Sequence, residues 1–130
     1  MNKKESFLDL LTSKTNLSSD AEGRITWEVG SPNDVENYVP NVDRVVRVIK
    51  TTYRNANVFY VEQKNWNYST DYDTHYENVD SFVLVERNNQ LVMNIYPAEI
   101  AEYVYERFSS AVVDSIEDSA LADLLADEEE

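Results

Sequence analysis

The sequence contains no cysteine and only two glycines, Gly23 and Gly30, among its 130 residues. A chain without thiols forms no disulfide, no thiolate zinc site and no cysteine nucleophile. Nucleotide-binding loops need several glycines close together, because their backbone amides must approach the phosphates of the ligand. The composition therefore excludes P-loop and dinucleotide-binding proteins.

Histidine is almost as scarce, since His75 is the only one. A serine–histidine–acid triad would have to use it, and no nucleophile motif accompanies it. The acidic segment around it, residues 71–82, does not match a calcium loop, because Tyr76 stands where an EF-hand needs glycine and Phe82 where it needs glutamate. We expect a protein that is not an enzyme and that holds no metal and no cofactor.

Long apolar runs are also missing from the sequence. No stretch approaches the roughly 20 apolar residues of a membrane-spanning helix. The basic start at Lys3 and Lys4 is followed by an apolar stretch, residues 7–11, which is too short for a signal peptide and contains Asp9. These features predict a cytoplasmic protein with no membrane partner.

Aromatic residues, by contrast, are plentiful: nine Tyr, four Phe and two Trp. Disordered chains of high net charge lack aromatic and β-branched residues, and 130 residues is the size of one domain. We expect a single folded domain over residues 1–126, followed by a frayed acidic tail at residues 127–130.

Hydrophobic periodicity predicts the elements of the first half. Ser6 would cap a helix at residues 6–13, and residues 24–29 alternate like a half-buried strand that turns Trp27 inward. Residues 42–54 are ambiguous. Their β-branched residues favour a strand, whereas valines and cations repeating at helical spacing favour a helix, and we expect the helix.

Three strands are expected in the second half, at residues 57–63, 81–86 and 91–96. The last two would be joined by a hairpin at Asn88 and Asn89, because asparagine tolerates positive φ. The polar residues 64–79 are typical of a long loop. Pro97 opens a helix at its preferred first position, and a second helical pattern covers residues 113–125.

This order of elements predicts an α+β fold. We expect a small, mainly antiparallel sheet of about four strands packed by helices, with two acidic helices at the C-terminus.

Negative charge is concentrated near the end of the chain. Residues 98–130 contain eleven acids and one base, Arg107, which is −10 of the total net charge of −14. Like-charge pairs four residues apart, such as Glu102 with Glu106 and Asp114 with Asp118, each cost an isolated helix a few tenths of a kcal/mol. Either these acids only keep the chain soluble, or they serve a cationic partner.

The amount of charge favours a comparison with nucleic acid. Duplex DNA carries one negative charge per about 1.7 Å of axis, so a face about 30 Å across corresponds to about 17 charges. In composition the chain is similar to small acidic proteins of phages and mobile elements that block restriction, repair or CRISPR enzymes by imitating DNA. The resemblance implies an anti-restriction type of inhibitor that binds a basic nucleic-acid-binding protein of the host and does not bind nucleic acid itself.

The expected partner-binding residues form two groups. Carboxylates near the C-terminus would supply charge, and tyrosines beside acids in residues 67–80 would supply rigid contact area. The full set is Glu99, Glu102, Glu106, Asp114, Glu117, Asp118 and Asp123 in the first group, with Asp71, Tyr72, Asp73 and Tyr76 in the second.

One basic stripe, Arg44, Arg47, Lys50 and Arg54, opposes this charge. We expect it to pair with the acidic helices of the same chain or of a second copy, the latter giving a homodimer. A second function also stays open. The protein could be a small acidic chaperone or immunity-type partner that binds through hydrophobic contacts while its charge keeps it soluble.

Overall fold

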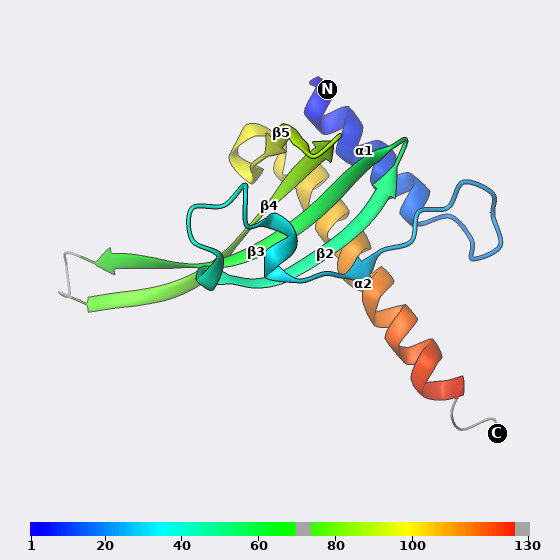
Figure 1. Cartoon of the computed structure of the whole chain (residues 1–130). Coiled ribbons are helices and arrows are strands. Elements are labelled where there is room, and N and C mark those ends of the chain that lie inside the picture. The colour runs from blue at the N-terminus through cyan, green and yellow to red at the C-terminus, as the bar shows by residue number, and fades with distance from the viewer. Residues whose placement is uncertain (70–73, 127–130) are drawn as a thin grey trace. The chain divides into compact units, whose positions relative to one another are not determined.

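The computed structural model describes residues 1–69 and 74–126, with the backbone alone for 67–69 and 74–76 (Figure 1). The chain divides into two compact units. The first comprises Met1–Glu28 with Pro97–Glu130 and holds the helices, and the second, Val29–Tyr96, holds most of the sheet. The fold class is therefore α+β, as the sequence predicts. The expected tail at residues 127–130 lies outside the described residues.

The sheet has five strands, rather than about four, and their spatial order follows their order along the chain. The strands β2 to β5 pair antiparallel with their neighbours. Their bounds are β1 (Glu28–Val29), β2 (Val45–Tyr53), β3 (Ala56–Ser69), β4 (Thr74–Arg87) and β5 (Gln90–Ile95).

Two tight turns set the register of the sheet. Asn88 and Asn89 have φ of 55° and 62°, which confirms the hairpin expected between β4 and β5. Arg54 and Asn55, with φ of 47° and 65°, make the equivalent turn between β2 and β3. Positive φ at both central residues gives the turn a twist that matches the flanking strands.

The prediction of a helix at residues 42–54 is wrong. A single 3₁₀ turn, η2 (Val42–Arg44), is followed directly by β2. The register of β2 against β3 shifts between Val45 and Arg47, which is a β-bulge. A bulge adds one residue to a strand and breaks its alternation. Because of it, the valines at 45 and 46 stand next to each other, and the apolar residues of the strand recur at a spacing typical of a helix.

The strand expected at residues 24–29 is shorter than predicted, because only Glu28 and Val29 join the sheet. Ile25 and Trp27 are buried as expected, whereas Val29, the third residue on that side of the alternation, is 64% exposed. The amide of Ile25 donates to the carbonyl of Lys14 at 3.1 Å instead of to a neighbouring strand.

The prediction of a long loop at residues 64–79 is also wrong. β3 continues to Ser69 and β4 begins at Thr74, and the two strands pair throughout. β2 pairs with β3 only as far as Gln63, and β5 pairs with β4 only from Val83 onward. Residues 64–69 and 74–79 therefore form a two-stranded arm, the long hairpin at the left of Figure 1.

The centre of the sheet is buried on both faces, as adjacent buried residues of β4 such as Val83 and Leu84 show. On one face the core includes Val35 from η1 (Pro32–Val35), with Tyr38 and Val39 packed against it. Its other members lie on or beside the sheet: Val45, Val48, Phe59, Val61, Phe82 and Leu84.

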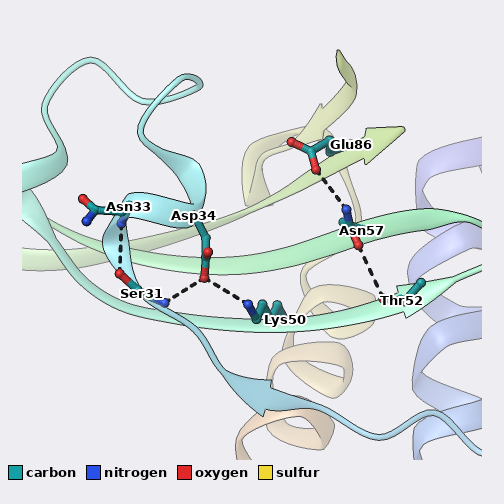
Figure 2. A network of polar contacts seen from close by, with 7 residues as sticks. All are labelled: Ser31, Asn33, Asp34, Lys50, Thr52, Asn57 and Glu86. Carbon is teal, nitrogen blue, oxygen red and sulfur yellow. Dashed lines mark hydrogen bonds and ion pairs between the residues drawn. The ribbon is translucent and has the colours of Figure 1, made fainter. Parts of the chain in front are cut away.

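Polar contacts hold η1 to the sheet (Figure 2). The Asp34 carboxylate accepts from the Ser31 amide at 2.9 Å and pairs with Lys50 at 3.3 Å. The backbone hydrogen bond, and then the lysine, hold the pKa of Asp34 below its usual value. Asn57 links Glu86, at 2.9 Å, to Thr52, at 3.4 Å, across three strands.

We predict that Gly30→Ala lowers the free energy of unfolding by about 1–3 kcal/mol, because overpacking forces neighbours apart. A Cβ at this position would lie 2.8 Å from the Asp34 carboxylate and 3.1 Å from a methyl group of the buried Val48. Both neighbours are held in place, Asp34 by Ser31 and Lys50. Urea unfolding followed by circular dichroism measures the loss. A change below about 0.5 kcal/mol, the size of an ordinary surface substitution, would show that these neighbours yield freely.

The first unit contains two α-helices. They are α1 (Lys3–Thr15) and α2 (Glu102–Ala126), with a 3₁₀ turn, η3 (Pro97–Glu99), ahead of α2. Asn2, rather than Ser6, caps α1, and its side chain accepts from the Glu5 amide at 2.8 Å. Among the described residues, no helix is both long and apolar enough to cross a bilayer.

The two C-terminal helices expected from the sequence are one continuous helix. Its first turns bury Val104, Phe108 and Ala111. The apolar residues that follow, Val113 and Ile116, are only half-buried and fall on another side of the same helix. This change of side, and not an interruption of the backbone, produced the second pattern.

Candidate protein-binding surface

Contacts at their N-terminal ends align α1 and α2 in parallel. Lys4 pairs with Glu99 at 2.9 Å, and the Glu5 carboxylate accepts from the Ala101 amide at 3.0 Å. The amides of Asn2 and Ala101 both donate to Glu5 and hold its pKa below the usual value. Further along, Arg107 pairs with Asp9 at 2.6 Å. These contacts fix which sides of α2 face α1.

An open groove of about 620 Å³ lies between the two helices. Asn16, just past the end of α1, and Asp114 of α2 both line it. Nearly all of its lining is polar: Asp9, Thr12, Ser13, Asn16, Glu106, Arg107, Ser110, Ala111 and Asp114. Such a groove is suited to polar contacts with another protein and offers little to an apolar small molecule.

Most of the predicted acids of α2 lie on one exposed side of the helix. The buried residues of α2 occupy the opposite side: Val104, Tyr105, Phe108, Ala111, Val112 and Ser115. With 3.6 residues per turn, Glu102, Glu106, Asp114 and Glu117 point away from this buried side, and Asp118 lies at its edge, two turns after the buried Ala111. All five of these predicted acids are exposed. We call these five residues the acidic face.

Two predicted acids fall outside the acidic face. Asp123 is exposed but lies three turns after the buried Val112, on the same side of the helix. Glu99 belongs to η3 and is paired with Lys4. Sequence spacing identified the charged helix but did not separate these two acids from the others.

Arg107 is the only cation of α2, and Asp9 neutralises it through the pair described above. Its guanidinium also lies 5.7 Å from the ring centroid of Tyr103. Because the pair of Arg107 and Asp9 is neutral overall, Arg107 does little to cancel the field of the acidic face. Exposed carboxylates are then left to act on a cationic partner.

Of the predicted tyrosine and aspartate group, only Tyr76 lies among the described residues of the arm. Asp71, Tyr72 and Asp73 fall outside the described residues, and Tyr76 is placed by its backbone alone, opposite Asn67. This group belongs to the second unit and the acidic face to the first. A joint surface made from both groups stays a prediction.

Two cations of the basic stripe pair with other acids than expected. Arg47 bonds Glu62 at 2.5 Å, and Lys50 bonds Asp34. Both acids belong to the second unit. Local cross-strand and loop contacts have satisfied these cations, so for Arg47 and Lys50 the expected pairing with the C-terminal helices is corrected.

Sequence reasoning missed two exposed apolar features. Trp66, on the arm, is 59% exposed. On α2, Leu121, Leu124 and Leu125 are 56%, 65% and 62% exposed. The leucines belong to the second helical pattern of the sequence, but seven-residue steps from the buried Val112 and Ser115 lead to Ser119 and Ala122 instead. The leucines are therefore offset from the core positions of α2, and this offset was the signal in the sequence that could have shown their exposure.

Comparisons of the chain with models of protein families, with curated proteins and with solved structures find no match. Function is therefore argued from the surface alone.

Proposed function

We propose that the chain is a non-enzymatic acidic binding protein that occupies the basic surface of a DNA- or RNA-binding protein and thereby inhibits it. The acidic face is the observation that carries this proposal. Four exposed carboxylates share the side of α2 opposite its buried residues, Asp118 lies beside them, and the only cation of that helix is paired with Asp9. Charge gathered in this way steers oppositely charged partners into fast, salt-sensitive association.

The magnitude of the charge limits how closely α2 imitates DNA. Glu102 and Asp118 are sixteen residues apart, which is about 24 Å along a helix. Duplex DNA carries about 14 charges over that length, against the five carboxylates of the acidic face. The acidic face alone therefore supplies only part of a duplex field, and contacts of another kind must add to the affinity.

A second function, that of an acidic chaperone or immunity-type partner, is favoured by the exposed leucines of α2. In that case apolar contacts would dominate binding and the acids would serve solubility. The two proposals differ in their response to salt, because exposed charges are screened within roughly 4–5 Å at 0.5 M NaCl.

Affinity capture at low salt tests the proposed function. The immobilised chain is exposed to an extract of the cells that express it, and captured proteins are identified by mass spectrometry. We expect a nucleic-acid-binding protein that is released by 0.5 M NaCl, by heparin or by a 30-base-pair duplex. Retention in all three eluents would contradict the proposed inhibitor of a nucleic-acid-binding protein and would support the acidic chaperone.

A further inference from the structure

The exposed leucines of α2 lie where the contact between α1 and α2 ends. The two helices run parallel, and the groove between them reaches Asn16 and Asp114. α1 stops at Thr15, whereas α2 continues for twelve residues beyond Asp114, about 18 Å. Figure 1 shows this C-terminal part of α2, in orange and red, extending past the end of α1.

Helix geometry places the leucines on the side of α2 that faces the groove. Leu121 follows Asp114 by seven residues, or two turns, and Leu125 follows it by eleven, or three turns. Leu124 completes a cluster with spacing i, i+3, i+4, the spacing of an apolar anchor on one helix side. The position that a longer α1 would occupy is therefore bordered by three exposed leucines.

Carboxylates precede the leucines on the same side. Asp114, Glu117 and Asp118 stand seven, four and three residues before Leu121. Together these six residues form a face that is acidic at one end and apolar at the other, which we call the leucine–acid face. The opposite side of the last turns continues the buried positions with the small residues Ser119, Ala122 and Ala126, and with Asp123.

We infer that the leucine–acid face binds an amphipathic helix of a partner protein, seated beyond the end of α1 and alongside α2. The partner helix presents apolar side chains to Leu121, Leu124 and Leu125 and lysine or arginine to Asp114, Glu117 and Asp118. This inference rests on the proposed function and adds the apolar anchor that the limited charge of α2 requires.

Charge selects this partner over a second copy of the chain. After Arg107 the sequence has no lysine or arginine. Two copies joined through their leucines would bring carboxylates of α2 together without a compensating cation. Like charges at an interface oppose association, whereas a cationic helix satisfies the acids and covers the leucines at once.

Synthetic helical peptides of defined composition test the inference. The first peptide carries a leucine stripe flanked by lysines, the second has glutamate in place of each lysine, and the third has serine in place of each leucine. Fluorescence anisotropy measures their binding to the full chain at 0.05 M and 0.5 M NaCl. We expect the first peptide to bind most tightly and the second not to bind.

Variants of the chain separate the inference from the proposed function. Leu121→Ser with Leu125→Ser should weaken the first peptide about 10-fold or more at both salt concentrations, because truncated apolar anchors lose contact that salt does not screen. Asp114→Asn, Glu117→Gln and Asp118→Asn together should weaken it mainly at 0.05 M NaCl. Leu17→Ser is the matched control, since Leu17 is an exposed leucine that lies outside α2.

The binding of the two variants distinguishes failure of the inference from failure of the proposed function. Unchanged binding after the leucine substitutions overturns the inference and leaves the proposed function in place if the acid variant still weakens binding. An acid variant that binds like wild type contradicts the proposed function. Sedimentation that shows a wild-type dimer, lost in the leucine variant, makes a second copy the occupant and overturns the inference. The substituted positions are exposed, so unaltered thermal unfolding will verify the fold of each variant.

Discussion

We expect Phe108→Ala to lower the free energy of unfolding by about 3–5 kcal/mol, the cost of removing a buried phenylalanine side chain. Phe108 is 0% exposed. Its ring lies 5.9 Å from Trp27, edge to face at 77°, and 6.3 Å from Tyr105. Alanine leaves a cavity among these rings and removes both aromatic contacts.

The size of this effect is large against the whole stability of a small protein, about 5–15 kcal/mol. Urea unfolding followed by tryptophan fluorescence measures it, because Trp27 contacts the substituted ring and reports the loss directly. The variant should unfold at a much lower urea concentration while its m-value stays constant.

Tyr103→Ala is the matched control on the same helix. Tyr103 is 57% exposed, and its described contact is with the Arg107 guanidinium. An exposed cation–π contact contributes about 0.5–1 kcal/mol, so the control should lose no more than that. Equal losses for Phe108 and Tyr103 would contradict the assignment of Phe108 to the core.

The predictions from sequence succeeded where one local rule acted alone. Asn88 and Asn89 gave the β4–β5 hairpin, because asparagine adopts positive φ with little strain. Pro97 marks the start of helical backbone only in part, because it begins the 3₁₀ turn η3 and the helix expected from it starts at Glu102. Trp27 and Ile25 were identified as inward residues even though the strand around them is shorter than expected.

The predictions failed where periodicity did not reflect the environment of the strand. Val48 and Ile49 are both buried because the sheet centre is covered on both faces, so β2 shows no alternation there. A bulge between Val45 and Arg47 removed the rest of the pattern. The sequence of β2 therefore resembled a helix although its β-branched residues pointed to a strand.

The prediction also failed at the arm, here because its strands are exposed rather than buried on both faces. Its described side chains, including Lys64, Trp66 and Glu77, are exposed apart from the half-buried Asn65, because no third strand of the described chain pairs with either strand of the hairpin. A two-stranded ribbon with solvent on both sides has no apolar alternation to detect. Cross-strand contacts, such as the pair of Lys64 and Glu77 at 3.4 Å, support it instead.

For the candidate surface, the sequence identified the charge but not the side of the helix on which it acts. Counting acids predicted seven partner-binding residues near the C-terminus, and four of them, with Asp118 beside them, share one exposed side. The leucines belong to the second helical pattern, and spacing alone does not say which side of a helix is covered. Only the buried set around Val112 settles that question.

Charge reversal on the acidic face should have the largest effect on binding. We expect Glu106→Lys, Glu117→Lys and Asp118→Lys together to slow association with the captured basic partner by about 10- to 1000-fold at low ionic strength, the range that electrostatic steering supplies. All three residues are exposed, and Glu106 and Glu117 lie on the same side of α2, with Asp118 at the edge of the acidic face. Stopped-flow or surface plasmon resonance measures the rate at 0.05 M and 0.5 M NaCl.

Arrangement and total charge are separated by a matched control. Asp20→Lys, Glu22→Lys and Glu36→Lys change the net charge by the same amount at exposed positions outside α2. If the acidic face is the binding surface, this control keeps most of the wild-type association rate, because screening weakens charges farther than about 10 Å at 0.1 M salt. If both triple variants slow association equally, the partner responds to overall charge and α2 is not the surface that it recognises.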